Sequence, residues 1–264
     1  MNGLLAKSLS DQRRAMIGWG LGIAGVALMY AAVYPSIQDS AKELTDYVEN
    51  LPDAIKNLIG GEDYTSPTGY LRSELFSSMG PLLVLIFAIG AAGRATAGEE
   101  ENQTLDLLLS TPVRRRQVLL DKAVAIVAVC ALLGAVTFAA VALIGPMFDL
   151  DVPVADLAAA CLMLSLLGLS FAGITLAVGA ATGRRVVADA AAGGFAVVAF
   201  IVNALAPSVS WLAPVRPLSP LRWYMEPSAI SDGLTALNIA VLVGIAIVGY
   251  VVAHVLFERR DLHG

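Results

Sequence analysis

Hydrophobic residues in this chain gather into long stretches that contain no charged side chain. Six stretches of 18 or more residues lack Asp, Glu, Lys, Arg and His, and they cover residues 15–38, 75–93, 123–148, 157–183, 190–215 and 233–253. A helix needs about 20 apolar residues to cross the hydrocarbon core of a bilayer, so each stretch is long enough for one crossing. The pattern predicts an all-α integral membrane protein with six transmembrane helices.

We predict one transmembrane domain over residues 1–264. Two of the connections between its spans have patterns of their own. Apolar residues recur at near-helical spacing among charged residues in the connection 37–74, which predicts amphipathic helices on the outer surface, either as a packing lid or as a gate. Five prolines and three aromatic residues occupy the connection 207–232, which excludes one continuous helix there. The spans are predicted at about residues 15–36, 75–94, 118–146, 156–183, 187–206 and 234–257.

Composition agrees with a membrane protein. The chain is 57% hydrophobic and 15% charged, whereas soluble domains carry about 25% charged residues. Small and hydroxyl residues are concentrated in the predicted fourth span, where they mark either a helix–helix interface or a lining surface. These residues are Ser165, Gly168, Ser170, Gly173, Thr175 and Gly179.

The distribution of positive charge predicts the orientation. If both termini are cytoplasmic, 12 of the 17 Lys and Arg residues fall in inner segments and 5 in outer ones, as the positive-inside rule requires. The outer five are Lys42, Lys56, Arg72, Arg216 and Arg222. Acidic residues predominate in the predicted outer loop 37–74, and no basic face suited to nucleic acid is evident.

Residues 98–122, GEEENQTLDLLLSTPVRRRQVLLDK, form the most charge-dense stretch of the chain. Its acids at 99–101 suit the first turn of a helix, where free N–H groups and the positive end of the helix dipole favour negative charge. Leu105, Leu108 and Leu109 follow at i, i+3, i+4 spacing, which gives one apolar stripe. The segment therefore predicts a short amphipathic helix.

Pro112 ends this predicted helix near Ser110, because proline pushes Thr111 out of helical geometry and has no N–H to continue the ladder. The arginines at 114–116 follow at once. A triple arginine at the foot of an apolar run indicates a cytoplasmic membrane surface. From this pattern alone, a generic helix lying in the membrane interface remains an alternative.

At these residues the chain resembles the ABC-2 transporter permeases, whose loop between the second and third spans commonly reads GEE, then TLDLLLSTPV and Arg. The matching residues here are Gly98, Glu99, Glu100, residues 104–113 and Arg115. The stretches LSPLRW at 218–223 and FERRDL at 257–262 also look like those of such permeases. The resemblance implies that two permease chains, identical or homologous, pair above two ABC ATP-binding subunits.

The same resemblance implies a coupling helix at 99–111, between the second and third spans, that sits in a groove of the ATP-binding subunit. It assigns the ATPase-coupling role to Glu99, Glu100, Thr104, Leu105, Leu108, Leu109, Pro112, Arg114 and Arg115. It further implies short re-entrant or surface helices in 207–232 that shape an extracellular gate. The candidate gate residues are Trp211, Trp223 and Tyr224, for which an interfacial aromatic belt is the alternative.

Several kinds of chemistry are missing from the sequence. No G-x-x-x-x-G-K-[ST] phosphate cradle occurs, so we expect ATP and Mg²⁺ to be bound by a partner ATPase and no cofactor by this chain. No ionisable residue lies near the middle of a predicted span, which argues against ion-driven transport. With two histidines near the carboxyl end and two cysteines inside apolar runs, we expect no catalytic and no metal site.

Together these patterns predict a permease subunit in the plasma membrane that exports a hydrophobic or amphipathic substrate by means of ATP hydrolysis in a separate subunit. Membrane lipids are the other expected partners. Two alternatives remain at this point. They are an ATP-independent assembly or sensor protein and, less favoured, an intramembrane enzyme, which would need a nucleophile and base or metal ligands at membrane depth.

Overall fold

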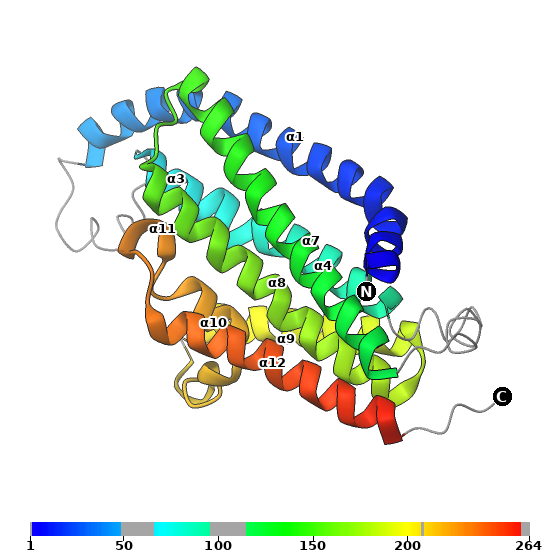
Figure 1. Ribbon diagram of the computed structural model, residues 1–264. Helices are drawn as coiled ribbons and strands as arrows, with labels where there is room; N and C mark the ends of the chain where they lie inside the picture. Colours follow the sequence, from blue (N-terminus) through cyan, green and yellow to red (C-terminus); the bar gives the residue numbers. More distant parts are fainter. Residues whose placement is uncertain (1, 49–65, 96–114, 207–208, 260–264) are drawn as a thin grey trace.

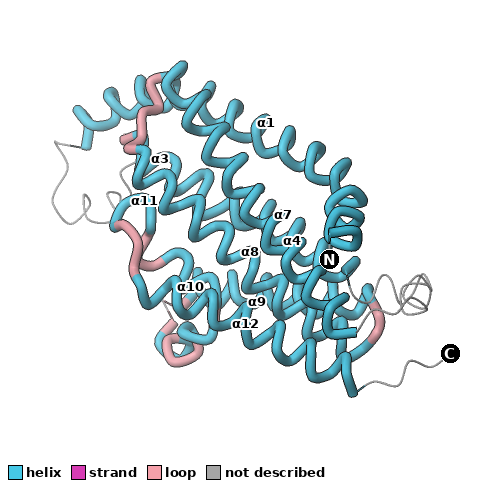
Figure 2. Tube along the Cα trace, in the orientation of Figure 1, coloured by secondary structure: helices cyan, strands magenta, loops and turns pink. Residues whose placement is uncertain are grey.

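The computed structural model (Figures 1 and 2) describes residues 2–48, 66–95, 115–206 and 209–259, and at 2–15, 41–48, 115–116 and 259 it describes the backbone alone. These residues form helices joined by short turns, and no strand occurs among them. The predicted all-helical fold is therefore confirmed for the described part of the chain.

The helices follow one another in the order of the chain. They are α1 (Asn2–Val48), α3 (Pro67–Leu71), the π-helix η1 (Arg72–Met79), α4 (Gly80–Ala95), α7 (Arg115–Ile144), the 3₁₀-helix η2 (Gly145–Phe148), α8 (Val154–Thr182), α9 (Arg185–Leu205), the 3₁₀-helices η3 (Ser210–Leu212) and η4 (Arg216–Leu218), α10 (Pro220–Met225), α11 (Ala229–Asp232) and α12 (Ala236–Arg259).

Within the described residues, six helical segments are long and apolar enough to cross a membrane, which confirms the predicted number. They are Met16–Ser40, Pro67–Ala95, Gln117–Phe148, Val154–Thr182, Arg185–Leu205 and Ala236–Glu258. A helix suits this setting because it pairs the backbone N–H and C=O groups within its own segment, where hydrocarbon offers no water as a partner.

Two helices extend beyond the charge-free stretches that predicted them. α1 continues through Pro35 to Val48, so part of the predicted outer loop 37–74 is a continuation of the first helix. The second spanning segment begins at Pro67, because the side chain of Ser66 caps the helix start by accepting a hydrogen bond from the Gly69 N–H at 3.1 Å. A helix can contain charged residues once it lies outside the membrane core. The first charged residue therefore marks the limit of the core and not the end of the helix.

The bundle has two ends, which we name after residues that lie there. At the Arg94 end, α4, α8 and α12 end while α1, α7 and α9 begin, on the right of Figure 1. The opposite Tyr224 end holds α3, η1 and the short helices between α9 and α12, on the left of Figure 1. The end of α4 and the start of α7, which flank residues 96–114 in the chain, both lie at the Arg94 end.

Helix α8 lies at the centre of the bundle. In the most apolar window of each span, the buried share is 72% for α8 but only 22% for α1 and α9 and 17% for α12. α8 packs against α4, α7, α9 and α12. The peripheral helices therefore leave most of their apolar surface to lipid or to other chains.

Small residues allow α8 and α12 to approach each other closely. A Cβ atom on Gly249 of α12 would lie 2.5 Å from the carbonyl oxygen of Gly173 in α8, and one on Gly173 would lie 2.8 Å from the carbonyl oxygen of Ala246. The hydroxyl of Ser170 donates across this contact to the carbonyl oxygen of Leu242 at 2.9 Å. Such close packing and interhelical hydrogen bonding stabilise helix pairs in lipid, where the hydrophobic effect between helices is absent.

The same helix uses small residues against its other neighbours. A Cβ atom on Gly168 would lie 2.7 Å from Cγ1 of Val84 in α4, and one on Gly134 of α7 would lie 2.9 Å from the carbonyl oxygen of Cys161. Ser165, Ser170 and Thr175 are buried. Of the two readings that the sequence left open for the fourth span, the structure supports the helix–helix interface at these positions.

The glycine contact between α8 and α12 predicts a position-specific effect on stability. Gly249→Ala should destabilise the protein by about 1–3 kcal/mol, the usual cost of overpacking, because its Cβ would meet the backbone of Gly173. Gly244→Ala in the same helix is the matched control, since no atom lies within 4 Å of its added Cβ. Thermal unfolding of the detergent-solubilised protein should show a lower Tm for Gly249→Ala only; equal Tm values for the two variants would contradict the contact.

Candidate functional site

The second spanning segment contains a π-helix with one carbonyl group that the helix itself does not satisfy. At the end of η1, the N–H of Gly80 donates to the carbonyl oxygen of Leu75, five residues earlier. In that pattern the carbonyl of Phe76 would receive the N–H of residue 81, which is proline and has no N–H. The Phe76 carbonyl therefore needs a partner from elsewhere.

Tyr224 of α10 supplies this partner. Its hydroxyl donates to the carbonyl oxygen of Phe76 at 2.7 Å, and its side chain is buried. Burial, with a smaller effect of Cys161, raises the pKa of the Tyr224 phenol well above its ordinary value, so the group keeps the proton that it donates. One of the three candidate gate residues thus attaches the connection between α9 and α12 to the second span.

The other two candidate gate residues have different surroundings. The side chain of Trp211 in η3 is 73% exposed, while the indole N–H of Trp223 donates to the carbonyl oxygen of Pro217 at 2.8 Å and the Arg222 guanidinium lies 4.6 Å from its ring centre. The structure therefore places Tyr224 inside the bundle and Trp211 on its surface. The three residues share one connection but not one environment.

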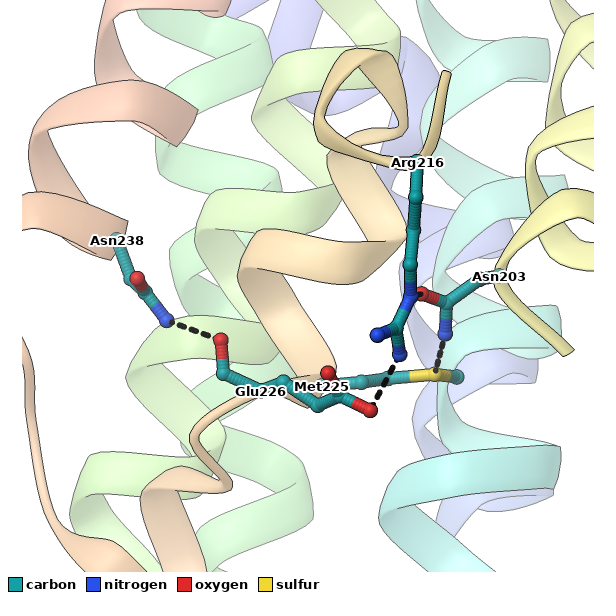
Figure 3. A network of polar contacts seen from close by, with 5 residues as sticks. All are labelled: Asn203, Arg216, Met225, Glu226 and Asn238. Carbon is teal, nitrogen blue, oxygen red and sulfur yellow. Dashed lines mark hydrogen bonds and ion pairs between the residues drawn. The ribbon is translucent and has the colours of Figure 1, made fainter. Parts of the chain in front are cut away.

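A network of polar side chains that the sequence did not single out holds this connection in place (Figure 3). Arg216 donates through its terminal nitrogen to Glu226 at 2.5 Å and through Nε to the side-chain oxygen of Asn203 at 3.3 Å. The amide of Asn203 contacts the sulfur of Met225 at 3.1 Å, and the amide of Asn238 donates to the carbonyl oxygen of Glu226 at 3.1 Å. The network joins α9, η4, the end of α10 and the start of α12.

Two signals in the sequence point to this network. Asn203 and Asn238 are the asparagines of the fifth and sixth predicted spans, and a buried amide in an apolar run needs a hydrogen-bonding partner. Arg216 and Glu226 lie in the proline-rich connection between those spans. Their pairing needed the fold, because they lie ten positions apart with Pro217 and Pro220 between them.

The predicted coupling residues fall mostly outside the described part of the chain. Glu99, Glu100, Thr104, Leu105, Leu108, Leu109, Pro112 and Arg114 lie outside the described residues, and Arg115 is the first residue of α7. What the structure does establish is the position of both attachment points. Segment 96–114 leaves the bundle at the end of α4 and returns at the start of α7, both at the Arg94 end.

Three helices meet around these attachment points. The buried ammonium group of Lys122 in α7 donates to the carbonyl oxygen of Ala95, the last residue of α4, at 2.5 Å. The carboxylate of Asp189 in α9 lies against Gly93, so that a Cβ on Gly93 would overlap it, and it pairs with Arg185 at 3.3 Å. A hydrogen bond thus connects the end of α4 to α7, and a close steric contact connects it to α9.

Two apolar grooves lie between the spans. One, of about 250 Å³, is bounded by α7, α8 and α12, with Ile126, Leu169, Ala172 and Tyr250 among its lining residues. The other, of about 270 Å³, lies between α7 and α8. Their linings are almost wholly apolar, so the chemistry they offer is the binding of hydrocarbon and not the hydrogen bonding of polar groups.

Within the described residues, no group of three or more His, Cys, Asp or Glu side chains is placed to hold a metal ion. Cys130 and Cys161 are buried as free thiols in α7 and α8.

The architecture defines a multi-pass helical membrane protein. The model of one family, described as ABC-2 family transporter protein, matches residues 3–262, nearly the whole chain. The chain therefore belongs to this family, which confirms the resemblance seen at residues 98–115, and it is the membrane component of an ABC transporter. Members generally work with an ATP-binding subunit and are not themselves ATPases. No curated protein matches the chain.

The hydrogen bond between Tyr224 and Phe76 can be tested by a double-mutant cycle. Tyr224→Phe should destabilise the protein by about 1–3 kcal/mol, because it leaves a buried carbonyl without a donor. Pro81→Ala restores an N–H to the second span, so the loss should be clearly smaller in the Pro81→Ala background. Trp211→Phe, at an exposed position, is the control. An equal loss in both backgrounds would show that the hydroxyl does not compensate for the proline.

Proposed function

We propose that this chain is the permease subunit of an ABC exporter whose ATP-binding subunits dock at the Arg94 end. The observation that carries the proposal is the family match over residues 3–262, and the position of segment 96–114 supports it. In this arrangement residues 99–111 form the coupling helix. The apolar stripe of Leu105, Leu108 and Leu109 seats in a groove of the ATP-binding subunit.

The distribution of cations over the described helices supports a cytoplasmic Arg94 end with both termini on the same side. Ten cationic residues belong to that end, whereas four belong to the Tyr224 end. Cytoplasmic segments are enriched in Lys and Arg. The ten are Lys7, Arg13, Arg14, Arg94, Arg115, Arg116, Lys122, Arg184, Arg185 and Arg259, and the four are Lys42, Arg72, Arg216 and Arg222.

Transport follows from a change between two arrangements of the bundle. Two permease chains pair above two ATP-binding subunits in the plasma membrane. Closure of the ATP-binding subunits on ATP and Mg²⁺ pushes the coupling helices and changes access to a cavity between the two permeases. Trp211, Trp223 and Tyr224 belong to the connection that forms the outer gate, and Tyr224 anchors that connection through Phe76.

The substrate is hydrophobic or amphipathic, such as a lipid or a lipid-like molecule. Two apolar grooves on the spans support this choice, and so do the buried shares of 22% and 17% that leave α9 and α12 with apolar surface to present. A polar substrate would require hydrogen-bonding groups along its path. The grooves offer almost none.

The partnership is tested by purifying the tagged full-length chain from its native membranes in a mild detergent. An ATP-binding protein should co-purify in a one-to-one ratio, and the complex should hydrolyse ATP. A preparation in which the permease is intact and no nucleotide-hydrolysing protein accompanies it would contradict the proposal.

The coupling helix is tested by Leu108→Asp combined with Leu109→Asp. Loss of two leucine side chains from a groove costs about 3 kcal/mol or more, so the ATP-binding subunit should bind at least about a hundredfold more weakly. Asp106→Ala, off the apolar stripe, is the matched control. Both variants should remain in the membrane with the Tm of the parent protein. Undiminished binding and ATPase stimulation in the double variant would remove this segment as the coupling element.

A further inference from the structure

The contacts around Gly93, Ala95, Lys122 and Asp189 carry an inference beyond the docking of the coupling helix, although it rests on the proposed function. We infer that these residues form a junction that makes α4, α7 and α9 move together when segment 96–114 is displaced. Lys122 and Asp189 are then positioning residues for coupling. They contact neither ATP nor substrate.

The first half of the junction joins the two helices that flank the segment. Ala95 is the last residue of α4 that the structure describes. Lys122 lies two turns into α7 and is buried, yet its ammonium group reaches the Ala95 carbonyl oxygen at 2.5 Å.

The second half joins α4 to α9. Gly93 lies two residues before Ala95, and the Asp189 carboxylate occupies the space that a side chain at position 93 would need. Arg185 fixes this carboxylate through an ion pair at 3.3 Å, and Arg94 lies close enough to Arg185 and Asp189 to interact with both. The last turn of α4 is therefore held on two sides.

The consequence is mechanical. A displacement applied to segment 96–114 could move α4 and α7 separately if only the chain connected them. A buried charged hydrogen bond such as that of Lys122 resists this separation. Asp189 extends the connection to α9, whose far end carries Asn203 of the polar network. Motion at the Arg94 end thereby reaches the connection that holds Tyr224.

Substitutions at Lys122 test the junction in the full chain together with its co-purified ATP-binding subunit, in lipid nanodiscs with ATP and Mg²⁺. Lys122→Met should preserve the subunit ratio and the KM for ATP. The permease is expected to change the kcat of ATP hydrolysis by its partner subunit. Lys122→Met should make this change at least about threefold smaller, because the loop still docks but α4 and α7 respond separately. Lys122→Arg should restore kcat, since its guanidinium can also donate to Ala95. Arg184→Met removes an exposed cation at the same end and is the control.

A second pair of variants tests the contact with α9. Gly93→Ala should have the effect of Lys122→Met, because its methyl group displaces the Asp189 carboxylate. Gly90→Ala, one turn earlier in α4, should have none, since only the flexible end of Arg94 lies near its Cβ, at 3.4 Å. Equal kcat values for the parent and Lys122→Met, or failure of Lys122→Arg to restore the loss, would overturn the inference.

A measurement on the chain alone separates this inference from the proposed function. Spin labels at the exposed positions Ile86 of α4 and Leu120 of α7 should report a narrow distance distribution that Lys122→Met broadens. An unchanged distribution overturns the junction whether or not an ATP-binding subunit exists. If the parent chain has no such subunit but the distribution broadens, the proposed function fails while the junction stands and only its role in coupling is lost.

Discussion

The close approach of α8 to its neighbours is the contact on which the rest of the bundle depends. Lipid is as apolar as leucine, so burial of apolar area alone does not hold spanning helices together. Gly173 and Gly249 bring two backbones into contact, and Ser170 adds a hydrogen bond to Leu242. With α8 fixed at the centre, α4, α7, α9 and α12 take positions around it, and their ends form the two polar regions at opposite ends of the bundle.

Much of the fold could be predicted from the sequence because a bilayer imposes a length on every crossing. Charge-free runs such as 157–183 gave the number of spans directly. The ends of α1 could not be found in the same way, since a helix continues past Asp39 once it has left the hydrocarbon. The π-helix in the second span was also missed, because the change from α to π pairing around Pro81 leaves no periodic signal in eight residues.

Some features of the candidate sites could likewise be predicted from the sequence, whereas others needed the fold. The motif at 98–115 could indicate the family from the sequence alone, because its residues are consecutive in the chain. The family match confirmed this indication. Polar contacts between distant segments, such as Arg216 with Asn203 or Tyr224 with Phe76, depend on which helices become neighbours. The resemblance grouped Trp211 with Tyr224 as candidate gate residues, but only the folded connection shows that Trp211 is exposed and Tyr224 is buried.

The pairing of Pro81 with Tyr224 also has an evolutionary consequence. Pro81 leaves the Phe76 carbonyl without a backbone donor, and Tyr224, more than 140 residues later, donates a hydrogen bond to it. Neither residue is therefore neutral without the other. A chain that loses the proline regains its own N–H donor and is free to lose the phenol. Among relatives, these two positions should therefore change together, and a mismatch between them should mark a lineage in which the connection between α9 and α12 is anchored by a different contact.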